Sequence, residues 1–293
     1  MDPLPPDAVR QIVVILAICN GVSMLGCFFN IFTAYYLKTV SHVLGKVVAI
    51  LSLMDLIFSI AGPMAAIPLD SGFYCRIVSL LVGFGLNGSL IWTCCFAFSF
   101  LQAIKQQDLD LLSHYFRKSM IVTVTFSIIQ AIYATVAPFK ENVSKMCIHQ
   151  IRANNFDYDA NLIVLLPMLL STLFCMVCYV IVYRKIKEAS NQQNLNLLVY
   201  PLILIICSFP IVSLTIIKQL YGPTAVTDTL MIIANALWGL QGFFNALAYG
   251  LSSEVIRSYR MKCCRRAKSI KSSMASDNSY SSPLFIESER SFR

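Results

Sequence analysis

Long apolar stretches recur along the chain, and short polar segments separate them. A helix needs roughly 20 apolar residues to cross a hydrocarbon layer about 30 Å thick, and seven stretches reach this length. The predicted spans are 12–37, 46–69, 74–104, 118–138, 160–185, 195–218 and 228–251. The pattern therefore predicts an all-α membrane protein with a seven-transmembrane helix bundle.

Composition agrees with this pattern. Hydrophobic residues make up 57% of the 293 positions and charged residues 13%, whereas about a quarter of the residues in soluble domains are charged. The composition excludes an ordinary soluble domain, and no basic groove for nucleic acid is expected.

The Lys and Arg residues predict the orientation, because the connections kept in the cytoplasm carry the excess of positive charge. If the N-terminus is outside, the inner side holds 17 of the 23, nine of them in the tail. The other eight are Lys38, Lys46, Lys105, Arg117, Lys118, Arg184, Lys185 and Lys187. The outer side holds Arg10, Arg76, Lys140, Lys145, Arg152 and Lys218. We therefore expect an extracellular N-terminus and a cytoplasmic C-terminus.

Four regions follow from these observations. Residues 1–11 form a short extracellular N-terminus, 12–251 the bundle, 252–264 an amphipathic helix next to the membrane, and 265–293 a disordered cytoplasmic tail. The amphipathic helix is expected to lie on anionic lipid, with Cys263 and Cys264 placed for palmitoylation. Phosphorylation of the serine-rich tail would recruit an arrestin-like partner; a solvated linker is the alternative.

One carboxylate, Asp55, lies within the apolar stretch LSLMDLIFSIAGP. A charge at this depth costs at least a few kcal/mol, so it normally faces a bundle interior and has a function. The amides of Asn30, Asn235 and Asn245 are the candidates to satisfy it, and Tyr249 completes a predicted switch network. Together with Gln241, the last span carries polar groups that should line a hydrated interior. Helix packing without switching is the alternative for Asp55 and Asn30.

Most of the eleven cysteines fall within apolar helices, where they are expected to act as small packing residues, including the Cys175 and Cys178 pair with its zinc-like spacing. Cys75 and Cys147 lie on the predicted outer side, where an oxidising compartment permits a disulfide. Asn142 begins an Asn-Val-Ser glycosylation acceptor on the same side.

Two further features concern the third and sixth spans. The stretch GFGLNG at 83–88 fits a dinucleotide-binding pattern, but no strand precedes it, so its glycines indicate close helix contact. Trp92 belongs to an aromatic and hydroxyl patch near mid-membrane, which a plain bundle core would also explain. In the sixth span, Pro201 and Pro210 can each kink the helix, which makes it a candidate moving element.

Four motifs carry a resemblance to a known family. They are Leu51-Ser52-Leu53-Met54-Asp55, Leu90-Ile91-Trp92-Thr93, Tyr200-Pro201-Leu202-Ile203 and, most specifically, Gln241-Gly242-Phe243-Phe244-Asn245-Ala246-Leu247-Ala248-Tyr249-Gly250. On these motifs the chain resembles G-protein-coupled receptors, and most closely the slime-mould cyclic-AMP receptors and their plant relatives, from about residue 12 to 262.

The chain departs from general receptor patterns at several positions. The triplet of Asp-Arg-Tyr type is Ser99-Phe100-Leu101 here, and the seventh span lacks the usual proline after Asn245. Ser208 replaces the tryptophan of the sixth span. Thr215 stands where close relatives carry a basic residue, and Lys218 lies one turn higher.

The resemblance implies a plasma-membrane receptor for an extracellular small molecule, with a cyclic-AMP-like ligand as a candidate. Its partner would be a heterotrimeric G protein, which Arg117, Lys118, Arg184, Lys185 and Lys187 would face. Trp92, Tyr200, Pro201, Ser208 and Pro210 would form the moving core of the third and sixth spans. In many related receptors the site at Asp55 also accepts a sodium ion, and no organic cofactor is implied.

Three other classes fit the sequence less well. A transporter or channel is the main alternative, but the sequence has no internal repeat and no paired interrupted helices. No nucleophile and base constellation or metal-binding pattern suggests an enzyme. The seventh span has no lysine for a retinal Schiff base.

Overall fold

The computed structural model describes residues 6–37, 43–65, 72–106, 111–136, 165–188, 199–222, 224–250 and 255–256. Every secondary-structure element in these ranges is a helix. The elements are α1 (Pro6–Tyr36), α2 (Val43–Ala65), α3 (Gly72–Gln106), α4 (Leu111–Val136), α6 (Leu166–Glu188), α7 (Val199–Tyr221), α8 (Ala225–Gly239) and α9 (Gln241–Gly250). The chain divides into two units, Met1–Gly250 and Leu251–Arg293, and the helices α1 to α9 belong to the first.

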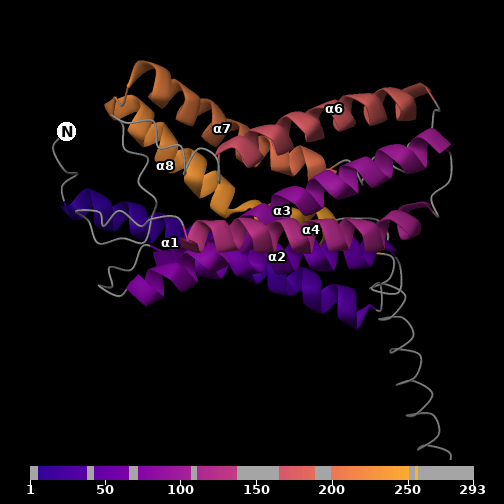
Figure 1. Cartoon of the computed structure of the whole chain (residues 1–293), viewed down its shortest axis with the longest axis horizontal. Helices are drawn as coiled ribbons and strands as arrows, with labels where there is room; N and C mark the ends of the chain where they lie inside the picture. Colours follow the sequence, from indigo (N-terminus) through magenta and orange to yellow (C-terminus); the bar gives the residue numbers. More distant parts are fainter. Residues whose placement is uncertain are drawn as a thin grey trace, which may run out of the picture. The chain divides into compact units, whose positions relative to one another are not determined.

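The long helix α3 organises the first unit. It runs obliquely between its neighbours and contacts α2, α4, α6 and α7 (Figure 1). On the other side of the bundle, α1 contacts α2, α8 and α9, and α7 contacts α6, α8 and α9. This arrangement brings α9, at the end of the unit, beside α1 and α2 at its start.

The described helices are those of a membrane protein. Five of them, α1, α2, α3, α6 and α7, are long and apolar enough to cross a hydrocarbon layer, and α8 with α9 would make a sixth if the bent pair is one span. The helix α4 is not among them, and its first turns contain His114, Arg117 and Lys118. The predicted count of seven therefore stands at five or six in the described residues.

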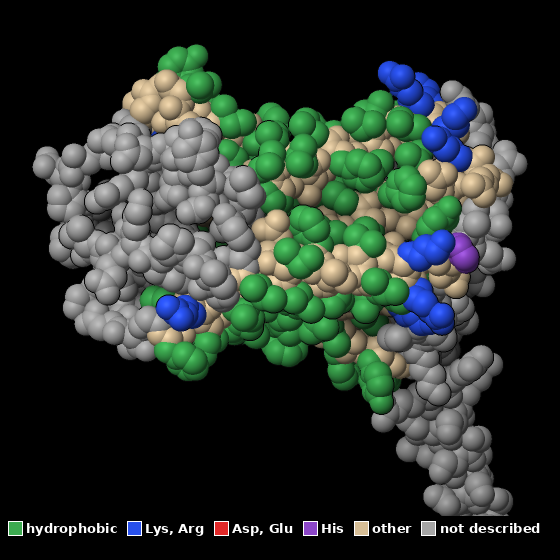
Figure 2. Space-filling model, viewed as in Figure 1, with side chains coloured by type: hydrophobic (Ala, Val, Ile, Leu, Met, Phe, Trp, Pro, Cys, Tyr) green, Lys and Arg blue, Asp and Glu red, His purple; other side chains and the backbone are tan. Residues whose placement is uncertain are grey.

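Large apolar side chains on the surface agree with a lipid environment. Leu25, Phe32, Ile121 and Val177 are each more than half exposed, and hydrophobic side chains cover the middle of the face seen in Figure 2. In water such a continuous apolar surface would mark an interface. Between the helices, many of the buried side chains are small or polar.

Glycines allow the closest helix approaches. A Cβ atom at Gly85 would lie 2.6 Å from the Phe58 backbone nitrogen, and one at Gly88 would lie 2.7 Å from the Met54 sulfur. At the contact of α1 with α9, a Cβ atom at Gly26 would lie 2.9 Å from the Phe243 Cα. The close contact predicted for the stretch at 83–88 is confirmed, since Gly85 and Gly88 let α2 and α3 touch.

The last predicted span, 228–251, was expected as one helix, and this expectation is wrong. The structure breaks it at Leu240 into α8 and α9, which are bent by 41°. Two glycines, Gly239 and Gly242, flank the break, and glycine weakens a helix by about 1 kcal/mol relative to alanine. The Gly242 N–H donates to the Ser23 hydroxyl of α1 over 3.1 Å.

The prolines of the sixth span differ in position. Pro201 is the third residue of α7, where helix N–H groups have no acceptor within the helix, so its ring interrupts no bond of the described helix. Pro210 lies inside α7. The bend of 41° in the described helices is thus in the last span, between α8 and α9.

Candidate functional site

Asp55 lies at the centre of a hydrogen-bond network inside the bundle. It is 5% exposed, and both of its carboxylate oxygens accept bonds from other helices. The Ser89 hydroxyl of α3 donates to Oδ1 over 2.6 Å, and the Asn245 amide of α9 donates to Oδ2 over 2.8 Å. A buried carboxylate is tolerable only when it is paired or hydrogen-bonded, and these two donors supply that.

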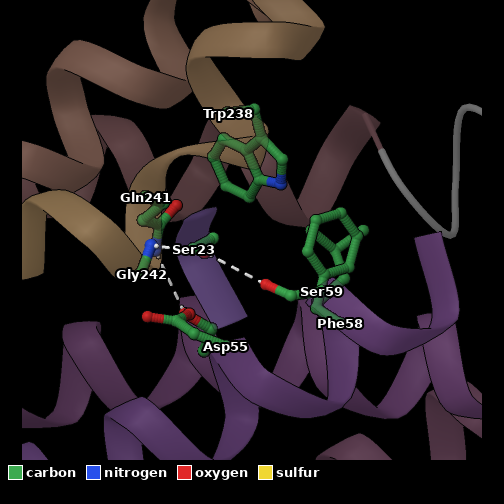
Figure 3. A pocket seen from close by; sticks show the side chains of 9 residues that line it. Ser23, Asp55, Phe58, Ser59, Trp238, Gln241 and Gly242 are labelled. Carbon is green, nitrogen blue, oxygen red and sulfur yellow. Dashed lines mark hydrogen bonds between the residues drawn. The ribbon is translucent and has the colours of Figure 1, made fainter. Parts of the chain in front are cut away.

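The network continues to the break between α8 and α9. Gln241 Nε2 donates to the Ser89 hydroxyl over 3.1 Å, and the Ser59 hydroxyl donates to the Ser23 hydroxyl over 3.0 Å. The Ser23 oxygen also accepts the Gly242 N–H. Figure 3 shows Ser23, Ser59, Gln241 and Gly242 converging above Asp55. Four helices, α1, α2, α3 and α9, therefore meet through polar contacts at this level.

A small cavity lies among these groups. Its volume is about 10 Å³, measured as the space open to the centre of a water molecule, and about this much is needed to hold one water. The lining consists of Ser23, Asp55, Phe58, Ser59, Leu86, Ser89, Trp238, Gln241 and Gly242. The Phe58 and Trp238 rings meet edge to face with centroids 6.4 Å apart. The cavity is thus polar near Asp55 and aromatic on its other wall.

Two of the three predicted amide partners of Asp55 bond elsewhere. Asn30 Nδ2 donates to the Ser52 hydroxyl over 3.0 Å, so the predicted contact with Asp55 is wrong although α1 and α2 are joined. Asn235 Nδ2 donates to the Met231 carbonyl of its own helix over 2.8 Å. Asn235 lies before the break at Leu240, whereas Asn245 lies after it. Because the helix bends between them, the two amides point to different partners, and Asn235 is not part of the Asp55 network.

The remaining predicted member, Tyr249, is buried one helical turn after Asn245. Sequence reasoning named Gln241 as an interior amide but missed Ser23, Ser59 and Ser89. Serine hydroxyls in helices often bond to the carbonyl four residues earlier, as Ser99 does with Cys95 here. A single serine in an apolar helix therefore does not indicate from the sequence whether its hydroxyl bonds to another helix.

The predicted core of the third and sixth spans is buried in the structure. Trp92 Nε1 donates to the Val47 carbonyl of α2 over 2.9 Å, and the Trp92 ring meets Phe116 of α4 edge to face. Tyr200 packs edge to face on Phe96 with centroids 6.3 Å apart. These contacts join α3 to α2, α4 and α7.

Ser208 forms a polar link between α6 and α7. Its hydroxyl lies 2.6 Å from that of Thr172 and donates to the Leu204 carbonyl over 2.7 Å. Pro201 is buried and Pro210 half-buried on the same helix. The hydroxyls of Ser208 and Thr172 thus join these two neighbouring helices.

Comparison with known proteins bears on the family. The chain is 22% identical over 266 residues to the cyclic AMP receptor-like protein A of Dictyostelium discoideum, an alignment that covers 86% of this chain and 69% of that protein. The predicted resemblance to the cyclic-AMP receptors is confirmed. No family model matches the chain. The similarity spans most of the bundle, as the motif-based resemblance did.

The residues expected to face a G protein are exposed at one end of this receptor-like bundle. Lys105 lies in the last turn of α3, Arg117 and Lys118 lie near the start of α4, and Arg184, Lys185 and Lys187 lie near the end of α6. Figure 2 shows most of the visible Lys and Arg side chains at the right end of the bundle. Lys218 lies near the end of α7 and forms an ion pair of 2.7 Å with Asp228 of α8.

Other predicted sites fall partly or wholly outside the described residues. Cys75 is in the first turns of α3, packs with Ala65 and Val78, and is disulfide-bonded. Its predicted partner Cys147 lies outside the described residues, so this pairing stays a prediction. Asn142, Cys263 and Cys264 lie outside them as well. Among the described residues, no group of three or more His, Cys, Asp or Glu side chains is placed to hold a metal ion.

Proposed function

We propose that this chain is a plasma-membrane receptor with seven membrane-spanning helices that transmits an extracellular small-molecule signal to a heterotrimeric G protein. The observation that supports it most is the buried network of Asp55, Ser89 and Asn245, which couples α2, α3 and α9. A membrane protein that only needed to pack would avoid the cost of a buried carboxylate. The similarity to the cyclic AMP receptor-like protein A points to the same class.

The mechanism is a population shift. A ligand changes the balance of two arrangements only if it binds the active one more tightly than the resting one. Asp55 and its donors, all within the bundle, would differ in their contacts between the two states, and the link of Thr172 with Ser208 would differ with them. The exposed basic residues at the ends of α4 and α6 would then meet the G protein.

The ligand is a small molecule in this proposal, and a cyclic nucleotide is the first candidate to test. Lys218 is the cation available near the outer end of α7, and Asp228 already pairs with it. A nucleotide phosphate would therefore compete with Asp228 for Lys218. Thr215, where close relatives carry a basic residue, is buried and uncharged.

A sodium ion fits the residues around Asp55. Hard cations prefer oxygen ligands, and the cavity is lined by the Asp55 carboxylate and the hydroxyls of Ser23, Ser59 and Ser89. The Gln241 Oε1 atom is buried and accepts no hydrogen bond from the described residues. When bound, the ion would neutralise the carboxylate and favour the resting arrangement.

The decisive experiment expresses the chain in cells that lack endogenous receptors and follows G-protein dissociation by resonance energy transfer. Cyclic AMP is tested first and a panel of small metabolites next. A saturable, concentration-dependent dissociation is expected, and it should disappear when Arg184, Lys185 and Lys187 are replaced by Glu. Absence of dissociation with every G-protein class and every compound would contradict the proposal.

The broken span favours a second candidate, a transporter or channel. Interrupted helices often form substrate and ion sites in transporters, usually as a corresponding pair, and α8 with α9 is an interrupted helix that the sequence did not reveal. Electrical recording from the same cells separates the two. Substrate-dependent current without G-protein dissociation would favour transport.

The proposal includes a plasma-membrane location, with the N-terminus outside the cell and the C-terminus in the cytoplasm. With Asn142 outside, Asn142→Gln should remove a glycosidase-sensitive shift in apparent mass, and an N-terminal epitope should be accessible on intact cells. A C-terminal epitope should be accessible only after permeabilisation. Palmitate on Cys263 and Cys264 and an arrestin-like partner of the phosphorylated tail complete the proposed cytoplasmic side.

A further inference from the structure

A pair of thiols lies away from the Asp55 network, where α6 packs against α3. Cys94 Sγ lies 3.7 Å from Cys175 Sγ and 3.7 Å from the Ser171 carbonyl oxygen. Cys175 is fully buried and Cys94 is half-buried, and both are free thiols. Packing explains why two small side chains are here, but it does not require their sulfur atoms to be in contact.

The geometry brings the two sulfur atoms close to bonding distance. A disulfide bond is about 2.05 Å long, so the sulfur atoms must approach by less than the width of one atom. We propose that Cys94 and Cys175 form an oxidisable pair that closes a disulfide between α3 and α6 when the protein meets a peroxide.

The neighbouring cysteines make the pair specific. Cys95, the next residue on α3, lies beside Thr123 and Ser119 of α4 instead of α6. Cys178 is one turn along α6 from Cys175 and is buried. Among the described cysteines, Cys94 and Cys175 are the two whose sulfur atoms are in contact. The structure therefore selects one pair from several cysteines of the same region.

The reaction balances with hydrogen peroxide as the oxidant. One thiol attacks the peroxide, the O–O bond breaks, and a sulfenic acid and one water form. The second sulfur then attacks the sulfenic sulfur, the S–S bond forms and a second water leaves. Two thiols lose their hydrogen atoms and the peroxide is reduced to two waters. Buried thiols react slowly because the thiolate is the nucleophile, but the second sulfur is already in place to trap the sulfenic acid.

The bond would restrain more than two helices. Thr172, next to Ser171 on α6, contacts Ser208 of α7, so one short segment of α6 touches both α3 and α7. A disulfide at Cys175 would tie α6 to α3 at this junction. If signalling requires the contact between α6 and α7 to change, as proposed above for Thr172 and Ser208, oxidation should reduce the response to stimulation.

The covalent bond can be tested without any assay of signalling. The full-length protein is purified in detergent under reducing conditions, treated with hydrogen peroxide, denatured, alkylated with N-ethylmaleimide and mapped by mass spectrometry. We expect a cross-linked peptide pair joining Cys94 to Cys175, with loss of alkylation at both, and reversal by dithiothreitol. The matched variant Cys95→Ala should still form it, and Cys175→Ala should not.

Three results would overturn the proposal. They are alkylation of both thiols after peroxide treatment, their separate oxidation to sulfinic acids, and linkage of Cys94 to Cys178. The wild-type map decides among these even if a variant folds poorly, and monodisperse elution on gel filtration checks the variants. A mapped disulfide with no change in signalling would leave the pair standing and weaken only its link to the proposed function.

Discussion

The Asn245 amide donates a hydrogen bond to the Asp55 carboxylate over 2.8 Å and joins two residues 190 positions apart in the sequence. The bond connects α2 with α9, the short helix that follows the 41° break at Leu240. Ser89 of α3 occupies the other oxygen of the same carboxylate. A rearrangement of any one of these helices would therefore change the surroundings of Asp55.

Removing the charge of Asp55 should change the balance of states. Asp55→Asn keeps the shape of the side chain, and Asn245 can turn its unpaired amide oxygen toward the new N–H group, so near-normal surface expression is expected. Basal or ligand-driven G-protein signalling should shift by more than tenfold, which corresponds to about 1.4 kcal/mol of coupling. The measurement is signalling divided by the number of surface copies. Low surface expression with normal signalling per copy would show that Asp55 only supports packing.

Sodium should stabilise the folded receptor through Asp55. A ligand that binds only the folded state raises its stability, by about 1.4 kcal/mol at ten times its dissociation constant. The thermal unfolding midpoint of the purified protein is therefore expected to be higher in sodium chloride than in choline chloride at equal ionic strength. Asp55→Asn should abolish this difference. An equal sodium effect in wild type and variant would place the ion elsewhere.

The close approach of α1 to α9 should not tolerate a methyl group. A Cβ atom at Gly26 would lie 2.9 Å from the Phe243 Cα and 3.1 Å from the Gly242 carbonyl oxygen, and backbone atoms cannot rotate away. Gly26→Ala should reduce the free energy of unfolding by about 1–3 kcal/mol, as overpacking does. Gly21→Ala on the same helix is the control, because its Cβ would meet nothing within 4 Å. Equal melting temperatures for the two variants would disprove the contact.

The hydroxyl pair of Thr172 and Ser208 should show coupling in a double-mutant cycle. Thr172→Val and Ser208→Ala each remove one partner of the 2.6 Å contact, and hydrogen bonds between membrane helices contribute on average about 0.6 kcal/mol. The effects of the two substitutions on unfolding should therefore be less than additive by roughly this amount. Thr93→Val is the comparison, since the Thr93 hydroxyl bonds to the Ser89 carbonyl of its own helix. Additive effects of Thr172→Val and Ser208→Ala would show that the hydroxyls do not interact.

Several features of this protein follow from the sequence alone. The length of an apolar stretch and the cost of a buried charge are local properties, so the helical membrane character and the interior position of Asp55 could be predicted from the chain. Gly85 and Gly88 predicted close helix contact on local grounds too. A residue without a side chain lets a neighbouring helix come close wherever the two helices pack. The motif around Asn245 marked the residue that does bond to Asp55.

Only the tertiary structure decided which polar groups meet. A rotation of a helix by one residue turns a side chain by 100°, so Asn30 bonds to Ser52 and Asn235 to its own helix although both are amides at plausible depths. The serines at positions 23, 59 and 89 became partners because four helices converge there. Just after the break at Leu240, the Gly242 N–H donates to the Ser23 hydroxyl of α1, which is far from Gly242 in sequence. Hydrophobic pattern sets which segments enter the membrane, whereas the packing of one helix against another sets the direction in which each polar side chain points.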